Sequence, residues 1–189
     1  AATAGTATTS PPLDLRIDVT PADAAERPNH VYLELWSAID KNTLALGFER
    51  VIDSHWTIAL EPQFYAQSQS AGGAKASAVS VALAVRPSYY FLQHSPSGPY
   101  IAPFGLVGYS RVTLEVPPEF MQPNEKISGT VWAVGVGAGW SLVINARAVL
   151  KLSAVFSYSK VAASASTSGL DASSSSATFT PFASAGVMF

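Results

Sequence analysis

The sequence has no cysteine and few charged residues for its length. Without cysteine there is no disulfide scaffold, no thiolate zinc site and no cysteine nucleophile. Charged residues make up 13% of the 189 residues, against about 25% in an ordinary soluble domain. Hydrophobic residues make up 48%, which is too many for a disordered chain. The formal net charge of −2 offers no strongly basic face, so we expect one folded domain and no nucleic-acid partner.

The sequence also lacks a run suited to a transmembrane helix, which needs about 18 or more consecutive apolar residues. The uncharged stretch 127–146 contains Gly135, Gly137 and Gly139, which share one face only if the segment is a strand. The uncharged stretch 87–110 carries four prolines, which break helices. The first residues show neither the basic start nor the apolar core of a signal peptide. We interpret them as the processed end of an exported protein.

Residues 1–29 are rich in Ala, Thr and Pro, a composition typical of a flexible segment. Within them, 13–19 alternates between apolar and polar residues and could form a short strand. From residue 30 to residue 189 a period of two dominates, which indicates β-structure throughout. We therefore predict a flexible periplasmic segment over 1–29 and a barrel domain over 30–189.

Eight strands follow from the alternation, and the connections between them differ in length. The connections at 51–54, 92–98 and 144–147 are short, whereas those at 69–74, 115–126 and 162–175 are longer and polar. Short turns at one end and long loops at the other are typical of transmembrane β-barrels. The predicted strands are 30–39, 43–52, 55–67, 75–91, 99–114, 127–143, 147–160 and 176–189.

The polar faces of these strands decide between a soluble barrel and a membrane barrel. In the strand over 55–67, Trp56, Ile58 and Leu60 lie opposite Thr57 and Ala59. A sheet facing water would carry many Lys, Glu and Thr, but here the polar faces are mostly Gly, Ala and Ser. Small residues suit the crowded interior of a narrow barrel. The sequence predicts an all-β, eight-stranded antiparallel transmembrane β-barrel with short periplasmic turns and longer extracellular loops.

Charged residues within the predicted strands lie mainly on the inward faces. Burial of unpaired charge is costly, so we expect these residues to pair in the lumen. The outward charges, Arg50 and Lys160, lie near strand ends, where they can reach the membrane interface. The predicted lumen network comprises Glu34, Glu49, Glu61, Arg86, Arg111 and Lys151.

Aromatic residues recur near both ends of the predicted strands. Two aromatic girdles flanking an aliphatic band are typical of membrane barrels, although aromatic residues also fill soluble cores. The predicted interface aromatics are Trp56, Tyr89, Phe91, Tyr100, Trp132, Trp140, Tyr158 and Phe189.

The last eight residues, 182–189, alternate back from a C-terminal phenylalanine. With the segments 44–50, 89–91 and 97–100, they make the chain resemble the small eight-stranded outer-membrane barrels of the OmpA/OmpX type. The resemblance covers about 30–189. It implies a location in the bacterial outer membrane, contact with lipid and lipopolysaccharide, and recognition of Phe189 by the barrel-assembly machinery. It implies no particular activity, because one fold hosts many functions.

Catalytic and metal sites find little support in the sequence. His94 and Ser95 are similar to the His-x-Ser pair of lipid A deacylases, but Pro96 stands at the position of the family's serine. The three histidines lack metal-ligand spacing, so we predict no metal and no cofactor. Glu49 and Glu61 point the same way from adjacent strands and could act as an acid–base pair. An internal salt-bridge network with Arg86, Arg111 and Lys151 is the favoured interpretation of both residues.

The apolar residues Phe120 and Met121, in a Pro-rich loop, either pack over the barrel mouth or form the candidate contact for a protein partner. The predicted function is a monomeric, non-catalytic outer-membrane barrel with a filled lumen and a structural, surface-interaction or envelope-complex role. Three alternatives stay open: a lipid A-modifying hydrolase or acyltransferase, a narrow channel, and a soluble ligand-binding barrel. The bulky residues Trp36, Tyr65 and Tyr109, interpreted as inward-facing, argue against the channel.

Overall fold

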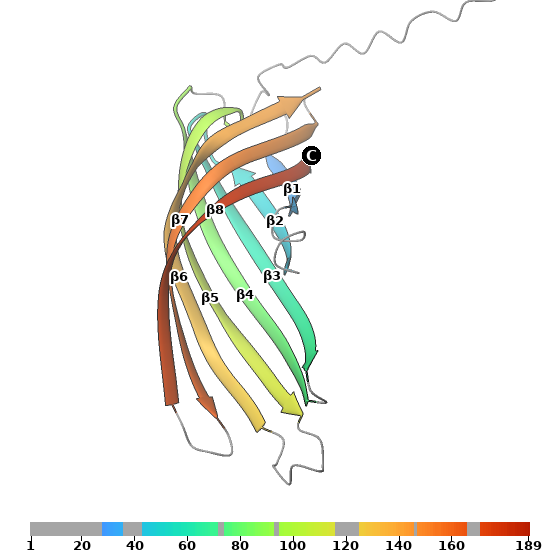
Figure 1. The fold of residues 1–189 in the computed structure, drawn as a ribbon. Coiled ribbons are helices and arrows are strands. Elements are labelled where there is room, and N and C mark those ends of the chain that lie inside the picture. Colours follow the sequence, from blue (N-terminus) through green and yellow to red (C-terminus); the bar gives the residue numbers. More distant parts are fainter. Residues whose placement is uncertain are drawn as a thin grey trace, which may run out of the picture.

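The computed structural model contains a single closed β-sheet (Figure 1). It describes residues 28–35, 43–71, 74–92, 95–115, 125–145, 147–165 and 171–189. The segment 1–27, with its predicted short strand at 13–19, lies outside the described residues. Among the described residues, no helix is long and apolar enough to cross a membrane.

Eight strands make up the sheet, as the alternation predicted. Because each strand is joined to the next by a hairpin, neighbours along the chain are also neighbours in the sheet. The strands are β1 (Asn29–Glu34), β2 (Thr43–Val51), β3 (Trp56–Ala71), β4 (Ala74–Tyr90), β5 (Gly98–Glu115), β6 (Glu125–Ile144), β7 (Ala148–Ala165) and β8 (Asp171–Met188).

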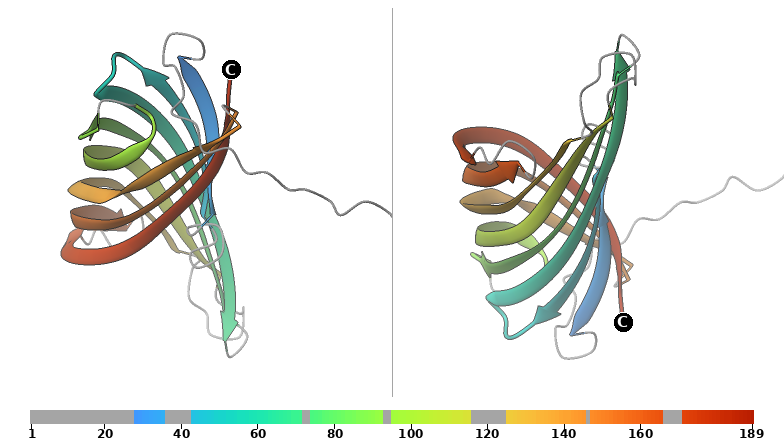
Figure 2. Two further views of the ribbon diagram at one scale, coloured as in Figure 1. Left: turned by 90° about the horizontal axis from the view of Figure 1, so that it is seen from above. Right: turned by 90° about the horizontal axis from the view of Figure 1, so that it is seen from below.

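The ring closes where β1 pairs antiparallel with β8, from His30 opposite Met188 to Glu34 opposite Ser184. Views along the barrel show β1 beside β8 at this seam (Figure 2). The backbone of Phe189 bonds to that of Asn29, so both ends of the barrel domain meet at the end of the short turns. The predicted eight-stranded antiparallel barrel is therefore confirmed.

Several strands are longer than the sequence predicted. Strand β7 continues to Ala165 and β8 begins at Asp171, within the segment 162–175 that was expected to be a loop. The sequence there is rich in Ser and Ala, so small residues lie on both faces and no alternation marks the strand. Strand β1, predicted to run to residue 39, ends at Glu34, and residues 36–42 lie outside the described part.

The wall of the barrel has an apolar outer face and a packed inner face. On β6, the outward residues from Trp132 to Trp140 span nine positions. A tilted strand needs about 9–11 residues to cross a bilayer, so this length is sufficient. Strands β3 to β8 have 16 to 20 residues each. These strands therefore extend well past the apolar band at the long-loop end of the barrel.

Glycine at position 47 is required by the ring of Tyr32, which lies on the inner face directly over it. A Cβ atom built at Gly47 would collide with that ring. We expect Gly47→Val to destabilise the barrel by about 1–3 kcal/mol, the usual cost of overpacking a core. The measurement is equilibrium urea unfolding of the protein folded in lipid vesicles.

Gly105 provides the matched control, because a Cβ atom built there has open space around it. Gly105→Val should leave the free energy of unfolding within about 0.5 kcal/mol of the wild type. Equal stability of the two variants would show that Tyr32 does not occupy the space above Gly47.

Candidate functional site

The interior of the barrel holds two layers of charged side chains. The layer nearer the short turns is centred on Glu49 of β2, which is fully buried. Lys151 of β7 donates a hydrogen bond to Glu49, and His30 Nε2 of β1 lies 3.2 Å from the same carboxylate oxygen. The site therefore joins three strands across the β1–β8 seam.

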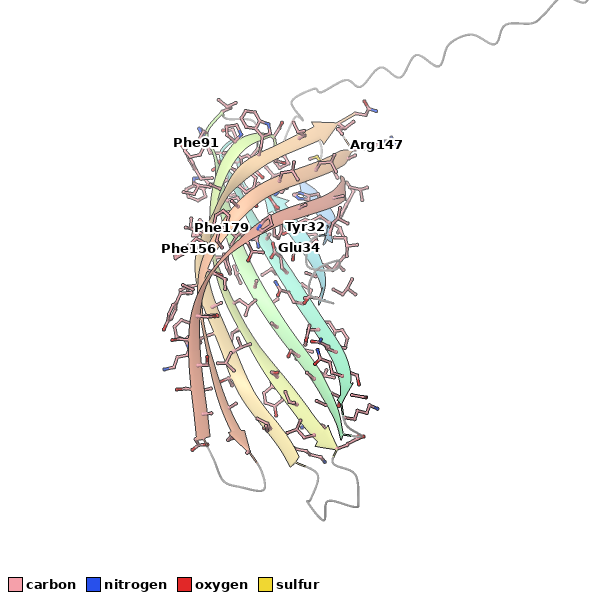
Figure 3. The ribbon with its side chains drawn as sticks, in the orientation of Figure 1. Tyr32, Glu34, Phe91, Arg147, Phe156 and Phe179 are labelled. Atoms are coloured by element: carbon pink, nitrogen blue, oxygen red, sulfur yellow. The ribbon has the colours of Figure 1, made fainter. Side chains whose placement is uncertain are left out.

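The second layer is centred on Glu61 of β3. Arg86 Nη2 of β4 donates to Glu61 Oε2 over 3.0 Å, and the hydroxyl of Tyr32 donates to the other carboxylate oxygen. Glu34, on the inner face of β1, acts electrostatically on Arg86 as well. Tyr32 and Glu34 are labelled in the side-chain view (Figure 3), on the β1 side of the barrel.

Aromatic rings complete both layers. The guanidinium of Arg86 stacks 4.3 Å from the ring centroid of Phe182 and 5.6 Å from that of Phe104. The ammonium group of Lys151 lies 5.5–5.8 Å from the centroids of three tyrosine rings, Tyr32, Tyr90 and Tyr100. Contacts of this kind stabilise cations that have been removed from water.

Buried side chains close the barrel between these layers and the short turns. Tyr90 is fully buried, and its ring centroid lies 5.3 Å from that of Tyr100. An apolar cluster of Val143, Val149 and Met188 packs at the same end. Toward the opposite end the interior widens into a cavity of about 210 Å³. The cavity is lined by Thr43, Gln63, Tyr65, Ser80, Ala82, Leu106 and Val131.

The structure places five of the six predicted network residues inside the barrel and moves the sixth outside. Glu34, Glu49, Glu61 and Lys151 are buried, and the Arg86 side chain is 11% exposed. Arg111 is instead exposed on the outer face of β5, where it pairs with Val79.

The prediction assigned the wrong face of β5 to the interior, so two aromatic residues of this strand were also assigned to the wrong side. Tyr100, predicted at the membrane interface, is buried inside, whereas Tyr109, interpreted as inward-facing, is exposed outside. Both faces of β5 are apolar along most of the strand, so the alternation carries no contrast that would fix which face is inside. In the structure Tyr100 pairs with the buried Tyr90 of β4, and this pairing sets which face of β5 is inside.

The other predicted interface aromatics lie on the outer face. They form two groups, one near each end of the apolar band, and Trp56 contacts Tyr89, which in turn contacts Phe91. Phe91 is labelled in Figure 3 near the short turns, with Phe156 and Phe179 further down the outer wall. The predicted interface aromatics that lie on the outer face are Trp56, Tyr89, Phe91, Trp132, Trp140, Tyr158 and Phe189.

Sequence reasoning missed His30 and Tyr32 as members of the interior network. A signal was available, because both precede Glu34 on β1 at intervals of two residues and therefore share its face. His30 is fully buried, and its Nε2 atom lies beside the carboxylate of Glu49.

The two carboxylates that the sequence suggested as an acid–base pair each have a cationic partner of their own. Glu49 pairs with Lys151 and Glu61 with Arg86. In the described ranges, no group of three or more His, Asp or Glu side chains is placed to hold a metal ion. His94, Trp36, Phe120 and Met121 lie outside the described residues.

Comparison with known proteins gives a match to one family model and matches to several solved structures. The model of a family described as "Protein of unknown function (DUF3575)" matches residues 32–168. The structure of CarO from Acinetobacter baumannii is 13% identical, with a TM-score of 0.46, covering 86% of this chain and 96% of that one. CarO2 from the same organism is 11% identical, with a TM-score of 0.42, covering 86% and 97%. No curated protein matches the sequence.

Proposed function

Since the chain belongs to the DUF3575 family, whose function is unknown, its role has to be argued from the barrel, and we propose an integral outer-membrane protein with a closed lumen. In this proposal it acts without catalysis, as a structural or surface-interaction component of the envelope. The long-loop end faces outward and the short turns face the periplasm, the usual orientation of such barrels.

The exposed apolar side chains of the outer wall support the membrane location. They cover β2 to β8 with large residues such as Leu152, Val107 and Phe179, which is 72% exposed. Monomeric soluble proteins rarely expose a contiguous apolar patch larger than a few hundred Å². A closed ring also satisfies the condition for crossing a bilayer, because it leaves backbone groups paired between strands.

The observation that carries the closed lumen is the pair of buried ion pairs, Glu49–Lys151 and Glu61–Arg86, stacked in two layers. An ion or solute that crossed the barrel would have to displace both layers and the Tyr90–Tyr100 pair below them. Displacing one partner leaves a buried charge unpaired, which costs about 3–5 kcal/mol. The same layers fix the charged groups in place, which supports a role without proton transfer.

Planar-bilayer recording tests the closed lumen. We expect the wild-type barrel to give no stepwise conductance under conditions in which a general porin gives regular steps. Replacing both ion pairs with alanine, at Glu49, Lys151, Glu61 and Arg86, should leave a hydrated path and produce small steps. Faster migration of unboiled samples on an SDS gel verifies that each protein is folded. Wild-type steps as large as those of the variant would contradict the proposal.

A further inference from the structure

The outer face carries cations at one edge of the apolar band in a repeated arrangement. On β5, Tyr109 is followed two residues later by Arg111, and on β7, Tyr158 is followed two residues later by Lys160. All four side chains are exposed on the outside of the barrel. Trp132 of β6 lies between them and pairs with Lys160 in the strand register.

The spacing between the two cations follows from the register. Arg111 pairs with Ser128 and Lys160 with Trp132, so the two cations are four positions apart along β6 and two strands apart across the sheet. With about 3.3 Å per residue and about 4.8 Å per strand, their Cα atoms are separated by about 16 Å. Tyr109 interacts with Arg111 and Ser128, which ties the arginine to the aromatic edge.

The outward acids of these strands stand further from the band. Glu115 comes four residues after Arg111 on β5, and Asp171 lies four residues from Ser175, the β8 partner of Lys160. Each is therefore about 13 Å further along its strand. Two further outward cations also lie beyond the band: Lys75 pairs with Glu115 in the register, and Lys126 of β6 pairs with Thr113, two residues beyond Arg111. Arg111 and Lys160 are therefore the positive charges nearest to the apolar surface on β5–β7.

We propose that Arg111 and Lys160, with Tyr109, Trp132 and Tyr158, form a binding site for the head group of a lipid that carries two phosphates. The acyl chains would lie against the apolar wall below, at Val107, Val134 and Phe156. A span of about 16 Å between the cation-bearing positions suits two separated phosphates better than one. Basic side chains beside a membrane bind anionic head groups through charge attraction, and in the proposed orientation this site faces the outer leaflet.

The inference rests on the proposed membrane location, and the test separates the two. Full-length protein folded in neutral detergent is titrated with diphosphoryl lipid A, with monophosphoryl lipid A and with the dephosphorylated lipid, and bound lipid is counted by native mass spectrometry. The variants are Arg111→Gln, Lys160→Gln and the double variant. The controls are Lys75→Gln and Arg50→Gln, which remove an outward cation next to Glu115 and one at the opposite rim.

We expect diphosphoryl lipid A to bind most tightly to the wild type. Each single variant should weaken it about fivefold and the double variant about thirtyfold, while the controls stay unchanged. Equal binding of the three lipids, or equal binding to wild type and double variant, overturns the site and leaves the membrane barrel standing. A wild-type chain that dissolves without detergent and shows no heat-dependent gel migration overturns the membrane location and the site together.

Discussion

Replacing Lys151 with methionine is expected to destabilise the folded barrel by about 3–5 kcal/mol. The substitution keeps the volume of the side chain but leaves Glu49 buried with His30 as its remaining partner. Because Glu49 is fully buried, water cannot replace the lost ammonium group as a partner of its carboxylate. Urea unfolding in lipid vesicles, followed by tryptophan fluorescence, measures the free energy of unfolding.

The double variant Glu49→Gln/Lys151→Met tests whether the loss comes from the unpaired charge. Because removing both charges leaves no buried ion, we expect most of the stability to return, as it often does when a buried pair is replaced as a unit. Lys75→Met, at an exposed position, should change stability by less than about 0.5 kcal/mol. A double variant as unstable as Lys151→Met would mean that the ammonium group acts mainly through its three tyrosine neighbours.

Replacing Val136 with arginine is expected to cost about 2–4 kcal/mol in lipid vesicles. Val136 is exposed on the outer face midway between Trp132 and Trp140, which places it near the bilayer midplane in the proposed orientation. The same change on a water-facing surface would stay within about 0.5 kcal/mol. The substitution therefore separates a wall that faces lipid from one that faces water.

Thr130→Arg is the matched control, because Thr130 is exposed on the same strand and face but lies beyond the aromatic edge. In the membrane barrel its cost should fall to about 0–1 kcal/mol, the value near an interface. Equal and small effects at positions 130 and 136 would contradict the membrane location. A steep difference between them would also fix how deeply the barrel is inserted.

Much of the architecture could be predicted because most strands show a strong contrast between their faces. Strand β3 sets Trp56 and Ile58 against Thr57 and Ala59, and that contrast fixed both the element and its outward side. Where contrast is missing, prediction fails in two ways. Strand β8 begins in a run of serines and was predicted too short, and β5 is apolar on both faces and was predicted inside out.

The sequence was sufficient to predict most of the charged residues in the interior, but not which of them form ion pairs. Alternation indicates that Glu49, Glu61 and Lys151 share the interior, because each lies on the small-residue face of its strand. It does not indicate which carboxylate meets which cation, since this depends on the tilt and register of strands far apart in sequence. The spacing of His30 from Glu34 indicates that it faces the interior, and the pairing of β1 with β2 places it opposite Glu49.

The short seam between β1 and β8 has a consequence for how the ring forms. In the described part of the chain this seam has five residue pairs, against 17 between β7 and β8. The Glu49–Lys151 contact spans this seam and joins residues 102 positions apart. Arg86 of β4 stacks on Phe182 of β8, a second contact between strands far apart in the sequence. Contacts so distant in sequence carry a large loop-closure entropy and form late. The Glu49–Lys151 pair therefore forms only when the ring closes, whereas Glu61 and Arg86, on the neighbouring strands β3 and β4, can pair while the sheet is still open.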